Sequence, residues 1–240
     1  MSYHIDCEIH THTLASGHAY GTIREMAQAA SEKGLALLGI SDHGPGIPGT
    51  CHPAWFACFD RLCRNINGVE ILGGAELNVM NDGSINFPER YMDSLDYAIV
   101  GIHPQCYEVM DAETNTDNTI SCMKHPKVFF VSHPDSDKLP VNYERLVPAA
   151  KELGVALEVN NSSLRFPDSR PGCVENYRTM LKLCMEHGCP IVVSTDSHDP
   201  CEVGVYEPAL SFLAELNFPE ELIVNTSAAK LKAFIGKEDK

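Results

Sequence analysis

Short runs of apolar and β-branched residues alternate with segments of helical periodicity along most of the chain. Seven such runs occur, at residues 5–9, 35–40, 69–77, 97–102, 128–132, 155–160 and 191–195. Strands of this length separated by helical segments are typical of βαβ units, in which successive strands lie parallel in one sheet. The pattern therefore predicts an α/β fold built on a parallel sheet.

The segments between these runs predict the helices. Thr22 and Glu25 form a capping-box sequence at the start of the first helix, and Gly34 ends it. A second helix is expected at 142–153, although Pro148 lies inside it and implies either a later start or a kink. Further helices are predicted at 173–187 and 219–235, with weaker signals at 53–66 and 114–124, and loops at 81–88 and 160–172.

Length and composition define the broad class of protein. A chain of 240 residues with 44% hydrophobic and 21% charged residues can bury one large core, so we expect a single domain over residues 1–240. No apolar run is long enough to cross a bilayer, and the N-terminus lacks the basic and apolar regions of a secretory signal. These features predict a cytoplasmic protein without a membrane partner. The ten cysteines form no CxxC pair and are expected to be reduced thiols.

The charge balance limits the class of ligand. A net charge of −15 argues against stable binding to nucleic acid, because that binding depends on clustered Lys and Arg. A small anionic substrate is compatible with the acidic chain if the site itself supplies a positive centre. The sequence leaves open whether the chain assembles into a homo-oligomer.

Residues able to bind metal ions stand at or just after the ends of six of the seven runs. They are His10 and His12, Asp42 and His43, Glu76, His103, His133, and Asp196 and His198. The sixth run ends at Asn160 and offers no imidazole. In a parallel barrel the C-terminal ends of all strands meet at one rim, so these residues would become neighbours.

Spacing separates these residues from the other histidines. His10 and His12 are two positions apart, as are Asp196 and His198, so both members of a pair point to the same face of an extended segment. Three histidines follow no strand and are expected to be structural or exposed: His4, His125 and His187. The loop of His52 follows the second run, and this residue is either an exposed side chain, which we favour, or a substrate contact at the rim.

Taken together, these motifs resemble the PHP (polymerase and histidinol phosphatase) superfamily, and most closely its YcdX-like branch of small phosphatases. The resemblance covers nearly the whole chain. It is carried by HTHTLASGHAYGT (10–22), ISDHGP (40–45), GAELN (74–78), GIHP (101–104), SHP (132–134), LEVNNSS (157–163) and STDSH (194–198).

The resemblance implies a distorted, TIM-like (β/α)7 barrel with a trinuclear centre of divalent ions, commonly zinc, with manganese and iron as alternatives. Its ligand sets would be His10, His12, Glu76 and Asp196 for the first ion, His18, His43 and His198 for the second, and Glu76, His103 and His133 for the third. Glu8 occupies the position two residues before the HxH pair, which is usually Asp in this family. We expect Glu8 to orient one of the imidazoles that bind metal.

Such a centre implies a metal-dependent phosphatase in which a metal-bridging water or hydroxide attacks a small phosphomonoester. Arg170, in the loop after the sixth run, is a candidate contact to the phosphate, and its alternative is an ordinary exposed arginine. Two other functions stay open: an amidohydrolase-type C–N hydrolase, since those barrels also begin with HxH, and a non-catalytic metal-binding or regulatory PHP module. The sequence identifies neither the substrate, nor the native metal, nor a general acid.

Overall fold

Strand pairing follows chain order and carries the chain around a barrel. In the computed structural model, which describes residues 3–236, the pairing order is β1, β2, β4, β5, β6, β7, β8, and each of these pairs is parallel. The strands are β1 (Cys7–Glu8), β2 (Leu37–Ile40), β4 (Val69–Asn78), β5 (Tyr97–Gly101), β6 (Val128–Val131), β7 (Ala156–Asn160) and β8 (Ile191–Ser194). The short β3 (Asn65–Ile66) pairs antiparallel with β4, outside this path. A nearly closed barrel of seven parallel strands confirms the predicted fold class.

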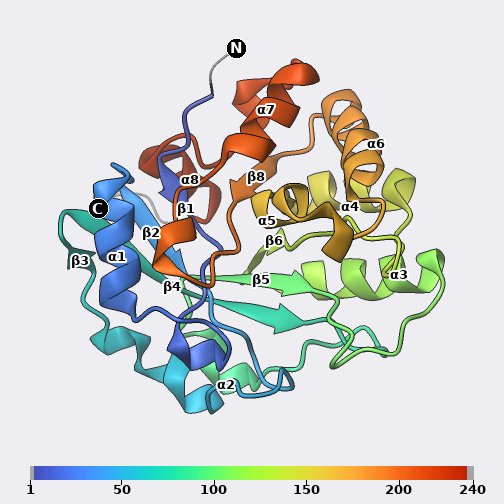
Figure 1. Ribbon diagram of the computed structural model, residues 1–240. Coiled ribbons are helices and arrows are strands. Elements are labelled where there is room, and N and C mark those ends of the chain that lie inside the picture. The colour runs from blue at the N-terminus through green and yellow to red at the C-terminus, as the bar shows by residue number, and fades with distance from the viewer. Residues whose placement is uncertain (1–2, 237–240) are drawn as a thin grey trace.

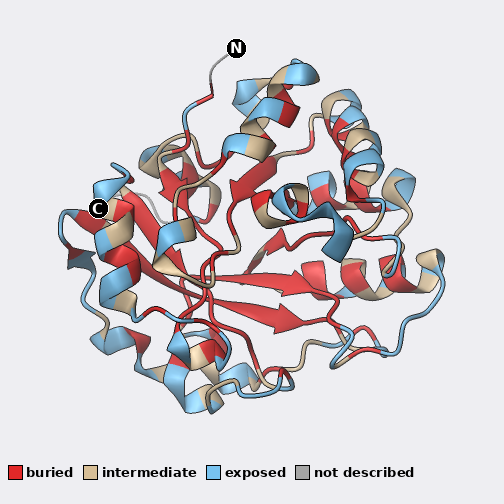
Figure 2. Ribbon diagram, viewed as in Figure 1, coloured by how far each residue is buried: buried red, intermediate tan, exposed pale blue. Residues whose placement is uncertain are grey.

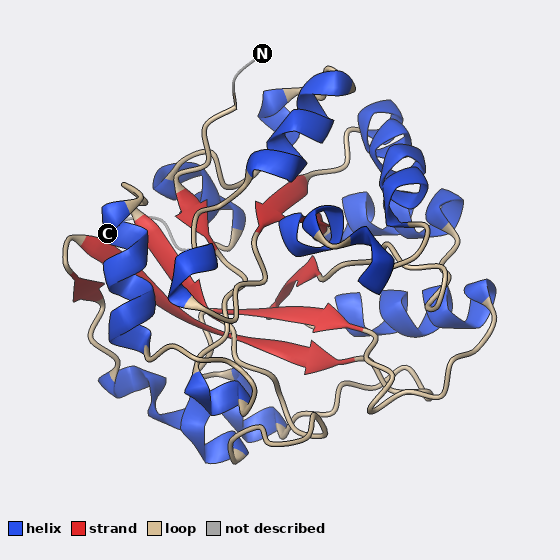
Figure 3. Ribbon diagram, in the orientation of Figure 1, coloured by secondary structure: helices blue, strands red, loops and turns tan. Residues whose placement is uncertain are grey.

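Helices connect the strands and cover the outside of the barrel (Figures 1 and 3). The α-helices are α1 (Ile23–Glu32), α2 (Glu89–Met92), α3 (Ala112–Met123), α4 (Tyr143–Leu153), α5 (Asn161–Arg165), α6 (Cys173–His187), α7 (Glu207–Glu215) and α8 (Ala228–Phe234). The 3-10 helices are η1 (Leu14–Ser16), η2 (Pro53–Arg61), η3 (Pro167–Ser169), η4 (Pro200–Glu202) and η5 (Glu220–Leu222). Within residues 3–236, every helix is too short or too polar to span a membrane.

The strands separate two apolar layers, and the strands themselves are buried while the helices expose their outer faces (Figure 2). Leu37 and Val192 point into the barrel with Tyr97 and Phe130. Their neighbours along the strands point outward against the helices, as Leu38 does. Because alternate residues of a strand face opposite sides, the same strands fill the barrel and hold its helical cover.

A single asparagine joins the two ends of the strand path. Asn225 Nδ2 donates to the carbonyl oxygens of Cys7 in β1, at 2.8 Å, and Val193 in β8, at 2.6 Å. Its Oδ1 accepts from the Val193 amide at 3.1 Å. Beyond the strands, Thr11 and Ser197 form a parallel bridge. The segments that follow β1 and β8 therefore run side by side, although the strands themselves do not pair.

Several predicted helices are confirmed. The capping box of Thr22 and Glu25 is present at the start of α1. The prediction at 114–124 corresponds to α3, and the one at 173–187 coincides with α6. The helix predicted at 142–153 is confirmed as α4, which begins at Tyr143 and contains Pro148, so the proline does not delay its start. Because proline has no backbone N–H, residue 148 cannot donate to the carbonyl of Glu144, and the helix lacks this one hydrogen bond.

Three segments differ from prediction. Residues 219–235 do not form one helix, because the chain between η5 and α8 enters the gap between β8 and β1 and bridges Ile223 to Ile191. Residues 53–66 form η2 and then β3, in place of one helix, and 160–172 contains α5 and η3 instead of a loop alone. Two further helices, α2 and α7, fall in no predicted segment.

Candidate metal centre

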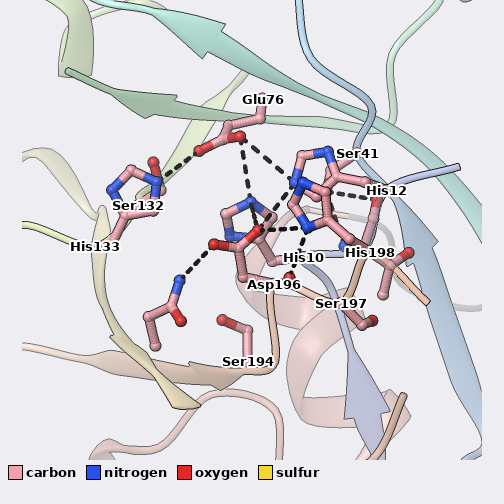
Figure 4. A network of polar contacts seen from close by, with 12 residues as sticks. His10, His12, Ser41, Glu76, Ser132, His133, Ser194, Asp196, Ser197 and His198 are labelled. Carbon is pink, nitrogen blue, oxygen red and sulfur yellow. Dashed lines mark hydrogen bonds and ion pairs between the residues drawn. The ribbon is translucent and has the colours of Figure 1, made fainter. Parts of the chain in front are cut away.

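Polar side chains from distant parts of the chain converge at the C-terminal ends of the strands. Figure 4 shows His10 and His12 after β1, Glu76 in β4, His133 after β6, and Asp196 with His198 after β8 pointing toward one another. All of them except His198 are buried or nearly so. The barrel therefore gathers at one rim the residues that follow its strands.

Glu76 lies at the middle of this cluster, and its two carboxylate oxygens face different imidazoles. Oε1 lies 3.1 Å from His103 Nε2 and 3.0 Å from His133 Nε2. Oε2 lies 3.4 Å from His10 Nε2 and 3.5 Å from His12 Nε2. The side chain thus stands between two groups of nitrogen donors, the geometry of a carboxylate that can bridge two cations.

Asp196 completes the group around His10 and His12. Its Oδ1 lies 3.5 Å from His10 Nε2 and 3.1 Å from His12 Nε2. Its Oδ2 accepts a hydrogen bond from Asn160 Nδ2 at 3.0 Å. Two imidazoles and two carboxylates from three strands therefore share one small volume.

A third group of imidazoles lies on the solvent side of His12. The Nε2 atoms of His18 and His198 are 3.1 Å apart. The ring of His43 lies 5.1 Å from that of His18 and 6.2 Å from that of His198, measured between centroids. His43 Nδ1 in turn lies 2.8 Å from Glu76 Oε2, so this group adjoins the central carboxylate.

Four buried side-chain nitrogen and oxygen atoms in the cluster have no hydrogen-bond partner among the described residues. They are His10 Nε2, His12 Nε2, His43 Nδ1 and Glu76 Oε2. A buried polar atom without a partner is costly, and native proteins usually satisfy such atoms. All four face the same volume, and imidazole nitrogen with carboxylate oxygen is the donor set that zinc and similar divalent ions prefer. The residues present therefore fit a divalent metal site.

The opposite side of most of these imidazoles is held by an oxygen acceptor. The Nδ1 partners are Glu158 Oε1 for His10 at 2.6 Å, Ser16 Oγ for His12 at 3.0 Å, Asn78 Oδ1 for His103 at 2.8 Å and the Asp196 carbonyl for His198 at 3.0 Å. A proton held on Nδ1 leaves the lone pair of Nε2 free toward the cluster, which is how metal-binding histidines are usually fixed.

Glu158 is a site residue that the sequence interpretation missed. It is fully buried in β7, where it contacts His10 and accepts a hydrogen bond from the backbone N–H of His133 at 2.6 Å. Ser194 also donates to it. The available signal was a glutamate inside the apolar run VALEVN, since a charged side chain is buried only where partners surround it.

Glu8, which was expected to orient an imidazole, forms its hydrogen bonds with backbone N–H groups and with Thr195. Its Oε1 accepts from the backbone N–H groups of Ile9 and His10, both at 2.9 Å. Its Oε2 accepts from the backbone N–H of Thr195 at 3.0 Å and from the Thr195 hydroxyl at 2.7 Å. Glu8 therefore fixes the backbone next to His10 and next to Asp196, while the imidazole of His10 is held by Glu158.

Electrostatics in the cluster favour a cation. Burial alone would raise the pKa of Glu76, but the surrounding imidazoles, His103 and His10 foremost, hold it well below its usual range. Burial and the neighbouring His43 hold the pKa of His12 well below normal. Burial also opposes a charge on His10, yet Glu158, Asp196 and Glu76 raise its pKa well above normal. The charged carboxylate of Glu76 and the neutral imidazole of His12 are in the protonation states that metal binding requires, whereas His10 would have to release a proton.

Two residues of the cluster have left-handed backbones. His133 has φ 30° and Asp196 has φ 52°, and each follows the end of a buried strand. Residues other than glycine rarely adopt positive φ, and such strain is found preferentially at functional sites. The turned backbone directs both side chains from the strand ends toward Glu76.

Two further predicted residues lie in different settings. Arg170 lines a cleft beside His103 and Asp196, and its Nη1 lies 3.6 Å from Asp135 Oδ1. Its side chain is only 23% exposed, so it is not an ordinary surface arginine. His52 is exposed and caps η2, because its Nδ1 accepts from the Ala54 backbone N–H at 3.1 Å.

Comparison with known proteins places the chain in one family. The model of the PHP domain family matches residues 8–153. A protein named probable phosphatase from Caldanaerobacter subterraneus subsp. tengcongensis is 40% identical over 242 residues, covering 100% of this chain and 94% of the relative. A second probable phosphatase, from Clostridium novyi, is 39% identical over 241 residues and covers 100% of this chain and 97% of the relative.

Solved structures share the fold at low sequence identity. The histidinol phosphate phosphatase of Lactococcus lactis subsp. lactis, determined with zinc, L-histidinol and phosphate, superposes with a TM-score of 0.59 at 16% identity, covering 89% of this chain and 94% of that one. A putative histidinol phosphatase from Listeria monocytogenes gives 0.63 at 15% identity, covering 83% and 97%. At this level of identity the likeness concerns the fold.

Proposed function

This chain belongs to the PHP domain family, and we propose that it is a metal-dependent phosphatase that hydrolyses a small phosphomonoester. One observation carries the proposal: Glu76, His10, His12 and His43 direct buried donor atoms without hydrogen-bond partners into one volume. The names of the full-length relatives support phosphate ester hydrolysis as the chemistry. They also favour it over hydrolysis of a C–N bond and over a non-catalytic module.

We assign the donor atoms to three divalent ions, with zinc as the metal. His10, His12, Glu76 and Asp196 would hold the first ion, His18, His43 and His198 the second, and Glu76, His103 and His133 the third. The separate directions of the two Glu76 oxygens support its shared role. The short distance between His18 Nε2 and His198 Nε2 supports their binding to one ion, because two lone pairs would otherwise face each other.

When bound, these ions would supply an activated water for attack on phosphorus and would stabilise the charge on the phosphoryl oxygens. The residues of the chain set the geometry. Glu158 keeps the proton of His10 on Nδ1, and Asn78 does the same for His103, so their Nε2 atoms keep free lone pairs. Arg170 would contact the phosphate, because its guanidinium lines the adjoining cleft and, within residues 3–236, has an ion pair with Asp135 at 3.6 Å but no hydrogen bond.

Replacing Arg170 with alanine tests this contact. We expect KM for p-nitrophenyl phosphate to rise by about tenfold, as loss of a charge-assisted hydrogen bond predicts, with a smaller change in kcat. Arg178, on the outer helix α6, carries the same charge away from the centre, so Arg178→Ala is the matched control. An unchanged KM in Arg170→Ala would remove this residue from the phosphate site.

The function is tested by elemental analysis of the purified protein together with a screen of phosphomonoesters. Release of inorganic phosphate, lost on chelation and restored by zinc, is the expected result. Release of ammonia from amide or amine substrates without phosphatase activity would point to the C–N hydrolase. Protein that carries metal but hydrolyses nothing across a broad panel would leave the non-catalytic module as the better description.

A further inference from the structure

A cleft of about 410 Å³ adjoins the cluster. His103 and Asp196 form the wall that it shares with the candidate metal centre. Its other walls come from the segments that follow β5, β6 and β7. Pockets for small ligands have volumes of this order, so the cleft can accommodate the alcohol part of a phosphomonoester while its phosphate lies at the centre.

The side chains that line this cleft carry an excess of positive charge. Arg170 and Lys138 contribute cations, and Asp196 is the only carboxylate among the described lining residues. Asp196 is assigned to a metal ion by the proposed function, so it is not free for a substrate amine. None of the described lining residues is Phe, Tyr or Trp, and the one ring among them, the imidazole of His103, is assigned to a metal ion by the proposed function.

Lys138 has a fixed backbone and a free ammonium group. Its backbone N–H donates to Ser136 Oγ at 3.2 Å, which anchors the turn that carries it. Within residues 3–236 its side chain forms no ion pair or hydrogen bond. The acidic neighbour Asp137 is engaged elsewhere, since its carboxylate accepts from Asn176 Nδ2 at 2.8 Å. An unpaired cation in an otherwise acidic protein is available to a ligand.

We propose that the substrate carries a second anionic group on its alcohol part and that Lys138 recognises this group. The inference rests on the proposed function and names its substrate class: a phosphomonoester of a small hydroxy acid or a sugar bisphosphate. Arg170 would hold the phosphoryl group that is hydrolysed, and Lys138 would hold the carboxylate or phosphate that is not. Both anions are recognised by the same chemistry, a charge-assisted hydrogen bond to an ammonium group.

Two matched pairs of substrates test the proposal. 3-Phosphoglycerate and glycerol 3-phosphate differ only in a carboxylate against a hydroxymethyl group. Fructose 1,6-bisphosphate and fructose 1-phosphate differ only in a second phosphate. We expect kcat/KM to be about three- to tenfold higher for the doubly anionic member of at least one pair, the effect of a partly exposed ion contact. The pair that shows this preference identifies the second anion as a carboxylate or as a phosphate.

Variants of Lys138 connect this preference to one side chain. In Lys138→Gln the ratio of the two kcat/KM values should fall toward one, and in Lys138→Glu it should fall below one. Lys151→Gln removes the same charge from the exposed end of α4, at the opposite end of the barrel, and should keep the wild-type ratio. Higher ionic strength should reduce the wild-type preference, because salt screens an exposed charge.

Activity toward p-nitrophenyl phosphate distinguishes failure of the second-anion site from failure of the proposed phosphatase function. If the metal-loaded protein hydrolyses this ester but prefers the doubly anionic member of neither pair, the second-anion site is overturned and the phosphatase stands. The same holds if the preference persists in Lys138→Gln. If neither p-nitrophenyl phosphate nor any of the four metabolites is hydrolysed, the proposed function fails and the substrate class fails with it.

Discussion

Glu158 shows how a single buried carboxylate organises the centre at the scale of one residue. It contacts the imidazole of His10 and the backbone of His133, which belong to the two donor groups on either side of Glu76. We expect Glu158→Gln to weaken metal binding by about ten- to a hundredfold, the usual effect of losing a carboxylate behind a metal-binding histidine.

Metal retained after dialysis against a weak chelator measures this effect. Glu186→Gln is the control, because Glu186 is a half-exposed residue of α6 whose side chain, among the described residues, forms only a 3.9 Å ion pair with Lys182. Equal metal retention in Glu158→Gln and the wild type would show that the hydrogen bond to His10 is dispensable.

The raised pKa of His10 predicts how metal binding depends on pH. Burial opposes its charge, but Glu158, Asp196 and Glu76 raise the pKa well above normal, so His10 is protonated at neutral pH in metal-free protein. A histidine binds metal only when its donor nitrogen is free, so a bound ion must displace this proton. Metal affinity should therefore fall as pH falls through the pKa of His10.

Titration calorimetry of chelator-stripped protein with zinc, in buffers of different ionisation enthalpy, counts the released protons. Release of about one proton at pH 7 is expected. It should be smaller in Glu158→Gln, which lacks the largest charge that raises the pKa of His10. Binding heats that do not depend on the buffer would contradict the assignment.

At the scale of the elements, the loop that carries His18 is held by contact between two glycines. Gly17 has φ 82°, and a Cβ atom there would lie 2.3 Å from the carbonyl oxygen of Gly49. The loop after β1 and the loop after β2 are further joined by a hydrogen bond from the Cys51 N–H to the Ala15 carbonyl at 2.8 Å. This contact places His18 against His198 across the rim.

Gly17→Ala should therefore separate the two loops and move His18 away from its partners. We expect less bound metal and a lower Tm. Gly34→Ala is the matched control, because Gly34 also has positive φ, 76°, but within residues 3–236 no atom beyond its chain neighbours lies within 4 Å of the added Cβ. The free energy of unfolding of Gly34→Ala should fall by only about 1 kcal/mol, because alanine is strained at positive φ, and this variant should keep its metal. Equal metal content in the two variants would show that the glycine contact does not position His18.

Local patterns predicted elements well only where local forces decide them. The capping box of α1 and the apolar spacing of α6 act within one helix, and both are found as expected. The segment 219–235 has helical periodicity, but Asn225 is required to close the barrel and breaks the helix. The hydrogen bonds of Asn225 join two strands that are more than 180 residues apart, so no short stretch of sequence could predict this break in the helix.

At the scale of the whole molecule, barrel closure is what turns separate motifs into one site. The parallel pairing followed from the alternation of apolar runs and helices, whereas the barrel was implied by the resemblance to the PHP superfamily. The partners behind the imidazoles could not be predicted in this way, because Ser16 in η1, Asn78 in β4 and Glu158 in β7 form no motif with a distinctive spacing. Sequence patterns predicted which residues lie together after the strands, whereas the structure was needed to find the side chains that hydrogen-bond to the imidazoles.

We propose that the clustered imidazoles and carboxylates hold three divalent ions on which phosphatase activity depends. The decisive experiment is to titrate chelator-stripped protein with zinc while phosphate release from p-nitrophenyl phosphate is measured. We expect no activity without metal and a rise that reaches its plateau at about three equivalents per chain. Undiminished phosphate release from metal-free protein, or a plateau at one equivalent, would contradict it.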